Sequence, residues 1–239
     1  MTPMNLILLN SDDQWIDAQR VRLSDRRAEH IRQVLRSQQG DTLRVGLLGG
    51  QLGTGWIEAI DANAVLMTVQ LLDPPPARHR FDLVLALPRP KMLRKILRTV
   101  AEFGAGHLHL IHSARVDRSY WQSPLLSEAK VDEALRMGME RSRDTLIPQV
   151  HRHRLFRPFV EDRLPGICQG RPCWIAHQEA GLGLSAVATQ PAVVMIGPEG
   201  GFVPFELELA ERMGAQRVHL GARTLSVDTA LTTVLAQAL

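Results

Sequence analysis

Cysteine, the residue that defines several classes of small protein, is scarce in this sequence. Its 239 residues contain only Cys168 and Cys173, and a disulfide framework or a structural zinc site requires more. His151, His153 and His177 flank this pair, but the spacing of Cys and His typical of metal ligands is absent. We therefore expect no metal site and two ordinary thiols in a reducing compartment.

Long hydrophobic runs are also absent. No stretch of about 18 apolar residues occurs, so no transmembrane helix is predicted. The N-terminal segment lacks the basic start and the small-residue cleavage site of a secretory signal peptide. These absences indicate a cytoplasmic protein without a membrane partner. Hydrophobic residues make up 45% of the chain and charged residues 22%, which indicates a globular core rather than disorder.

The basic residues that are present are unevenly distributed. Residues 78–157 contain 16 Lys and Arg against 8 Asp and Glu, whereas residues 1–77 contain 7 against 9 and residues 158–239 contain 5 against 8. A clustered basic segment is typical of proteins that bind a polyanion, most often a nucleic acid. A solvated basic surface without a ligand is the alternative.

A run of three prolines divides the chain. Three consecutive prolines cannot lie inside a helix or a central strand, so we place a linker at 74–78, between a domain at 1–73 and a domain at 79–239. The first domain is predicted to contain a helix with Ser24 as its N-cap. The elements expected there are this helix at 24–36 and strands at 42–48, 54–60 and 64–72, which suggest a small β-domain.

The second domain has the alternating pattern of an α/β protein. We expect a mostly parallel sheet with helices on both faces. The amphipathic helix at 91–104 has a basic outer face, but its apolar face is needed to cover the sheet, which disfavours a membrane-surface role. The strands expected are 81–88, 107–113, 171–177, 192–197 and 218–221, and the helices are 91–104, 127–142, 205–213 and 228–238.

Two strand ends carry the chemistry. A buried strand runs into Gly197-Pro198-Glu199-Gly200-Gly201, and glycines at such a position let a ligand approach the backbone. The loop lacks the Lys-Ser/Thr ending of a phosphate-binding loop, so a nucleotide-dependent enzyme is disfavoured. A tight turn without a ligand is the alternative.

The second strand end is the segment LGARTLSVDTA at 220–230. It is expected to lead into the last helix, with Ser226 as the N-cap and Asp228 in the first turn. The alternative to a ligand site is that Asp228 and Thr229 only cap this helix.

Together these two segments resemble the C-terminal signature of the 16S ribosomal RNA uridine N3-methyltransferases, a SPOUT family. HIRQVLR at 30–36, EFG at 102–104 and ERSRDTLIP at 140–148 resemble further segments of the family, in the same order. The resemblance implies a trefoil-knotted methyltransferase domain at 79–239 after a PUA-like, RNA-binding β-barrel at 1–73. General fold rules alone would disfavour a knot, so the knot rests on the resemblance. The resemblance also implies a homodimer.

The resemblance further implies S-adenosyl-L-methionine as methyl donor and ribosomal RNA of the small subunit as substrate, with uridine 1498 as the family target. Arg223 is the candidate to stabilise the uridine anion, with a phosphate or dimer contact as the alternative. Glu199 is a second candidate catalytic residue, which would orient the loop or the substrate. The implied donor-binding residues are Ile196, Gly197, Gly200, Gly201, Leu220, Gly221, Leu225 and Thr229. RNA contacts are expected from Arg22, Arg26, Arg36, Arg89, Lys91 and Arg143.

The sequence departs from the family pattern at a few positions. Ser226 and Asp228 stand where the family has Arg and Glu, and Arg141 and Asp144 stand where Gln and Arg are common. The lost arginine removes a contact to RNA, for which Arg143 could compensate, whereas the glycines of the donor loops are intact. Two alternatives therefore stay open: a methyltransferase that acts on another RNA, such as transfer RNA, and a non-catalytic RNA-binding member of the fold.

Overall fold

The structure is a computed structural model that describes residues 5–239; residues 1–4, part of the segment examined for a leader, lie outside it. Contacts between Cα atoms divide the chain into a first unit, residues 1–77 with 135–147, and a second unit, residues 78–134 with 148–239. The segment 135–147, which the sequence assigned to the second domain, therefore packs within the first unit.

The first unit is built on a six-stranded sheet of order β1-β4-β5-β6-β3-β2. Only the pair β1–β4 is parallel. Its core consists of alternate strand residues, among them Val21, Val45 and Met67, because successive side chains of a strand point to opposite faces. The strands are β1 (Ile7–Leu9), β2 (Gln14–Trp15), β3 (Arg20–Leu23), β4 (Thr42–Leu47), β5 (Leu52–Ile60) and β6 (Val65–Asp73).

The helical segment that follows β3 begins later than predicted. It comprises α1 (Arg26–His30) and the π-helical turn η1 (Ile31–Leu35). The N-cap is Asp25 rather than Ser24, and the Asp25 carboxylate accepts a hydrogen bond from the Arg27 backbone N–H at 2.9 Å. The buried Arg27 guanidinium also pairs with Asp25 and Asp13, so the cap is fixed by an ion-pair network as well as by the helix end.

The second unit contains a six-stranded sheet of order β12-β10-β11-β7-β8-β9, and all its strand pairs are parallel. This confirms the predicted mostly parallel α/β architecture. The last strand begins three residues before the predicted range 218–221. It is an edge strand, which tolerates polar residues such as Gln216 and Arg217, so its first residues do not form the apolar run from which a strand is predicted. The strands are β7 (Phe81–Ala86), β8 (His107–Ile111), β9 (Gln149–His153), β10 (Cys173–Ala176), β11 (Ala192–Ile196) and β12 (Ala215–Val218).

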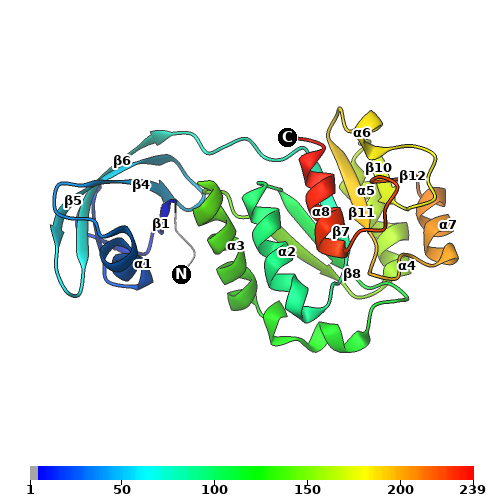
Figure 1. The fold of residues 1–239 in the computed structure, drawn as a ribbon, viewed down its shortest axis with the longest axis horizontal. Helices are drawn as coiled ribbons and strands as arrows, with labels where there is room; N and C mark the ends of the chain where they lie inside the picture. The colour runs from blue at the N-terminus through cyan, green and yellow to red at the C-terminus, as the bar shows by residue number, and fades with distance from the viewer. Residues whose placement is uncertain (1–4) are drawn as a thin grey trace. The chain divides into compact units, whose positions relative to one another are not determined.

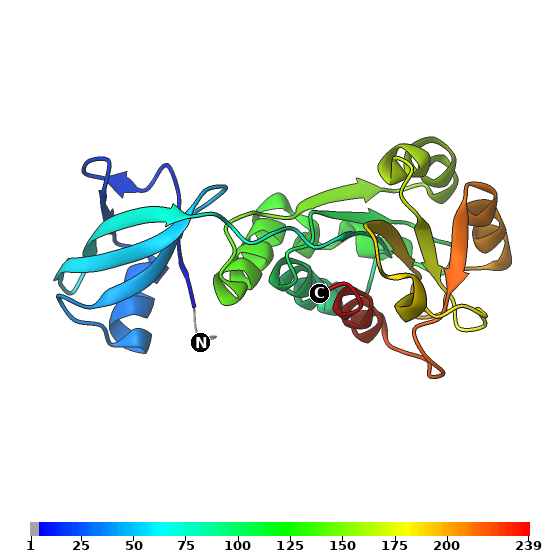
Figure 2. The ribbon, with the colours of Figure 1, turned by 90° about the horizontal axis from the view of Figure 1, so that it is seen from above.

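Helices cover both faces of this parallel sheet. Helices α2 and α8 lie side by side on one face, and α4, α5 and α7 lie on the other (Figures 1 and 2). The helices are α2 (Pro90–Glu102), α3 (Glu128–Ser142), α4 (Phe156–Pro158), α5 (Leu164–Cys168), α6 (Leu184–Val187), α7 (Pro204–Arg212) and α8 (Val227–Ala236), with short turns η2 (Arg118–Gln122), η3 (Pro124–Leu126) and η4 (Phe159–Arg163). No helix in the described part of the chain has the length and apolar character needed to cross a membrane.

Candidate functional site

A cavity of about 350 Å³ opens at the carboxyl ends of β10, β11 and β12. These three strands are adjacent because β10 lies between the other two, so the loops that follow them converge. The size is within the range of small-molecule sites. The lining residues are Arg115, Ala176, His177, Gln178, Glu179, Ile196, Gly197, Pro198, Glu199, Gly200, Gly201, Phe202, Leu220, Gly221, Arg223, Thr224, Leu225, Val227 and Ala230.

The loop after β11 requires its glycines. Gly201 has a backbone φ of 72°, a left-handed conformation that favours glycine. A Cβ on Gly197 would lie 3.2 Å from the backbone nitrogen and ring of Phe202, and one on Gly200 would lie 2.9 Å from the Arg115 side chain. Backbone groups of this loop therefore reach the cavity without side chains in front of them.

Arg115 is a lining residue that the sequence reasoning missed. Its guanidinium donates a hydrogen bond to the Gly200 carbonyl across the cavity wall. The preceding residue, Ala114, donates its N–H to the buried Glu206 carboxylate at 2.7 Å, and the same carboxylate accepts from the Val203 N–H at 3.0 Å. Glu206 thus fixes both the start of α7 and the segment that carries Arg115. Only the excess of Arg in residues 78–157 hinted at such a residue, and its partner is set by the tertiary fold.

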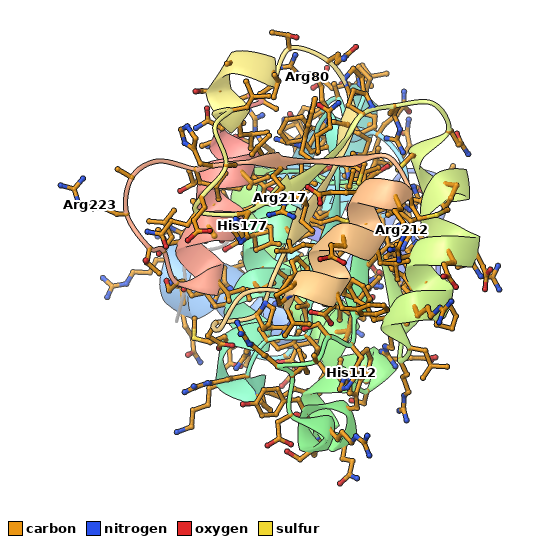
Figure 3. The ribbon with its side chains drawn as sticks, turned by 90° about the vertical axis from the view of Figure 1, so that its right-hand side faces the viewer. Arg80, His112, His177, Arg212, Arg217 and Arg223 are labelled. Carbon is orange, nitrogen blue, oxygen red and sulfur yellow. The ribbon has the colours of Figure 1, made fainter. Side chains whose placement is uncertain are left out.

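The loop after β12 closes the opposite side of the cavity. The Thr224 hydroxyl donates to the Gln178 side-chain oxygen at 3.0 Å, which joins this loop to the one after β10. Gly221 has a φ of 125°, which again favours glycine. Arg223 is exposed and extends from the loop away from the body of the unit (Figure 3), and it forms no ion pair within residues 5–239. The Arg223 guanidinium is therefore directed toward solvent rather than into the cavity.

Two of the residues that depart from the family pattern, Ser226 and Asp228, lie in a polar cluster at the start of α8. Ser226 occupies the N-cap position as predicted, but its hydroxyl bonds to the Asp228 carboxylate at 2.6 Å and the Thr229 hydroxyl at 2.9 Å instead of a backbone N–H. Asp228 also pairs with Lys95 of α2 at 2.6 Å. The bonds from Lys95 and Ser226 lower the pKa of the Asp228 carboxyl to about 2, so it is a weak proton acceptor at neutral pH. Thr229 does not line the cavity.

The residues expected to contact RNA are divided between the two units. Arg89 precedes α2 and forms an ion pair with Glu199 of the cavity wall at 3.4 Å, and both side chains are partly exposed. Lys91, the second residue of α2, is exposed. In the first unit, Arg26 is held at 2.5 Å by the buried Glu140 carboxylate. The remaining members of the set, all in the first unit, are Arg22, Arg36 and Arg143.

Neither cysteine takes part in a metal group. Cys168 and Cys173 are free thiols, the second of them buried. Across residues 5–239, no three His, Cys, Asp or Glu side chains are grouped so that they could hold a metal ion.

Comparison with known proteins places the second unit in an enzyme family. Residues 75–239 match the family model described as an RNA methyltransferase domain. The ribosomal RNA small subunit methyltransferase E of Treponema pallidum is 27% identical over 237 residues, which covers 95% of this chain and 87% of the relative. The protein of the same name from Synechocystis is 29% identical over 237 residues and covers 96% and 76%.

A solved structure has the same fold. The ribosomal RNA small subunit methyltransferase E of Neisseria gonorrhoeae, bound to S-adenosyl methionine, matches with a TM-score of 0.75. It is 20% identical, and the match covers 98% of this chain and 95% of that one. At this level of identity the match establishes the shared α/β architecture of both chains.

Proposed function

The chain belongs to the RNA methyltransferase domain family, and on that premise we propose that it transfers the methyl group of S-adenosyl-L-methionine to N3 of a uridine in 16S ribosomal RNA. The observation that carries the proposal is the cavity lined by the loops after β10, β11 and β12 in a chain whose curated relatives are named as small-subunit ribosomal RNA methyltransferases. Uridine 1498, the family target, is the proposed nucleotide.

The cavity suits the donor in size and in chemistry. Gly197, Gly200 and Gly221 bring the main chain to its wall, and backbone N–H and carbonyl groups can hold the edges of an adenine; of these groups the Gly200 carbonyl already accepts from Arg115 and the Gly221 N–H already donates to His219 Nδ1. Ile196 and Leu225 supply apolar surface for the faces of the ring. Bound there, the donor supplies an electrophilic methyl group.

The chain must hold the uridine in line with that methyl group and favour loss of the N3 proton. Positioning of the two reactants supplies much of the rate enhancement in such a transfer. We propose that Arg223 reaches the uridine from the rim of the cavity and stabilises the anion that develops on its ring. Glu199, restrained by Arg89, is proposed to orient the loop against the substrate. Asp228 is engaged by Lys95 and Ser226, and its lowered pKa makes it a weak proton acceptor.

The finer features of the architecture are proposed with the function. The mainly antiparallel first sheet is proposed to be part of a PUA-like barrel, and the C-terminal loops are proposed to form a trefoil knot. A homodimer is proposed from the resemblance of residues 197–201 and 220–230 to the family signature, and the exposed Arg223 is accessible to the RNA or to a second copy. A cytoplasmic location stays a prediction from the sequence.

The test combines donor binding with transfer. Purified protein is titrated with S-adenosyl-L-methionine in a calorimeter and then incubated with the methyl-tritiated donor and small ribosomal subunits from a strain that lacks this activity. The proposal expects saturable binding and label in the RNA. Binding without label in ribosomal RNA or transfer RNA would support the non-catalytic alternative, and label in transfer RNA alone would support the other RNA target.

A further inference from the structure

The first unit displays an exposed tryptophan in the middle of its sheet. The chain has four tryptophans, and Trp121 and Trp174 are buried, whereas Trp56 of β5 is 38% exposed. Its strand neighbours Gly55 and Ile57 are buried, so Trp56 points to the opposite, outer face. Part of this indole at the centre of the sheet is therefore accessible to a ligand.

The residues that pair with Trp56 across the sheet are not aromatic. Thr42 of β4 and Thr68 of β6 are its direct partners across the sheet. Both are small and polar, and no aromatic ring in residues 5–239 stacks on Trp56. The exposed part of the indole is therefore not covered by another ring of the described chain.

Arginines surround this tryptophan on the same face. Arg44 pairs with Thr54, which makes it a diagonal neighbour of Trp56 and within reach of its ring. On the other side, Arg20 pairs with Thr68. Arg22, two residues along β3 from Arg20, points to the same face.

The acidic groups near this face do not cancel its charge. Arg20 pairs with Asp17 at 2.7 Å, but both side chains are 45% exposed, and such a pair exchanges readily for another anion. Glu58 keeps its charge while it accepts a hydrogen bond from the Thr68 hydroxyl. Arg20, Arg22 and Arg44 stand against Asp17 and Glu58, three positive charges against two negative, so the face keeps a small basic excess although residues 1–77 as a whole carry more acidic than basic residues.

This combination favours a nucleic acid over a protein as the occupant. Trp and Arg also occur at protein interfaces, but a single aromatic residue set among threonines and three arginines matches a polyanion better than the apolar centre of a protein interface. One aromatic platform between arginines matches an unpaired base between two phosphates. A duplex would not offer its base faces to such a platform.

We propose that the outer face of this sheet is a stacking site for an unpaired base of the RNA substrate. Trp56 supplies the aromatic surface, and Arg44 and Arg20 contact the flanking phosphates. This inference rests on the proposed function only in that the substrate is RNA. It adds a recognition site on the first unit, whereas the methyl-donor cavity lies in the second.

The test measures binding of the full-length protein to a fluorescein-labelled single-stranded RNA of ribosomal sequence. Trp56→Ala is expected to weaken binding by roughly 10- to 100-fold, because a base loses its stacking partner. Trp56→Phe is expected to keep most of the affinity, since phenylalanine retains an aromatic face. Arg44→Gln is expected to lower the slope of log affinity against log salt by about one. Leu35→Ala, which removes an apolar side chain of the same 38% exposure on the helical segment of this unit, is the control and is expected to bind as the parent does.

Several outcomes would overturn the inference. Equal affinity of Trp56→Ala and the parent would remove the stacking site, and so would equal affinity of the parent for the duplex form of the same RNA. A change in oligomeric mass on Trp56→Ala would assign this face to a second copy instead. Methyl transfer by the parent is measured separately. If the parent methylates RNA and Trp56→Ala binds RNA as tightly as the parent, only the stacking site is contradicted. If the parent transfers no methyl group, the proposed function is contradicted.

Discussion

Four histidines on two neighbouring strands predict a strong dependence of stability on pH. His107 and His109 of β8 face His151 and His153 of β9, and the rings of His109 and His151 stack with centroids 4.4 Å apart. His109 is buried, and its Nδ1 lies 3.1 Å from Nε2 of His153. Burial, followed by the neighbouring histidines, lowers the pKa of His109 from 6.5 to about 3. The pKa values of His151 and His153 are lowered for the same main reason.

The direction and size of the effect follow from this shift. A histidine with a lowered pKa in the folded state binds protons more readily when unfolded, so its contribution to stability is complete above pH 6.5 and is lost as pH falls toward 3. At pH 5 an unfolded histidine is protonated, whereas folded His109 is not. The pH is then about 1.5 units below the pKa of the unfolded histidine, which lowers the free energy of unfolding by about 2 kcal/mol. Aspartates add little between pH 7.5 and 5, because they titrate below that window.

The assay is urea unfolding at pH 7.5 and pH 5, followed by tryptophan fluorescence, for the parent and for His109→Phe. The parent is expected to lose at least about 2 kcal/mol between the two pH values. His109→Phe keeps an aromatic ring in the stack and cannot titrate, so its loss is expected to be smaller by about that amount, whatever its stability at pH 7.5. An equal loss in both proteins would refute the reasoning.

Three further predictions concern the cavity. Gly201→Trp is expected to abolish binding of S-adenosyl-L-methionine, measured by calorimetry, because the indole fills the cavity. Gly170→Trp is the control: Gly170 also has a positive φ and open space around it but lies outside the cavity, so this variant is expected to bind the donor normally. Equal donor affinities of the two variants would remove the loop after β11 from the donor site. Arg223→Ala is expected to lower kcat by roughly 10- to 100-fold with donor affinity unchanged, and Arg212→Ala on α7 is its control; equal losses of kcat and donor affinity would refute a role on the substrate side. Arg115→Ala is expected to weaken donor binding by roughly 3- to 10-fold, because the Gly200 carbonyl loses its restraint, and unchanged affinity would contradict that role.

The parts of the fold that follow local rules were predictable from sequence. The Pro90–Glu102 helix has an apolar stripe that repeats at helical spacing, and Ala192–Ile196 is a continuous apolar run, as buried parallel strands are. The glycines at 197, 200 and 201 indicated a loop that a ligand approaches closely, and the structure places all three at the cavity.

The parts that depend on distant contacts were not predictable. The edge strand Ala215–Val218 contains Gln216 and Arg217, so it lacks the apolar run that marks an inner strand. The short strands β1 to β3 have too few residues for a periodic signal. The contact of Arg115 with Gly200 joins residues far apart in sequence, and no spacing reveals it.

The central claim is that this chain methylates one uridine of the small ribosomal subunit, and nucleotide-resolution mapping tests it most directly. Small subunits from a strain without this activity are treated with the protein and S-adenosyl-L-methionine, and the RNA is digested and analysed by mass spectrometry. The account predicts one new methyl group, at N3 of a single uridine, and none when Gly201→Trp replaces the parent. A methyl group on another base or another RNA, or no methyl group with the donor bound, would contradict it.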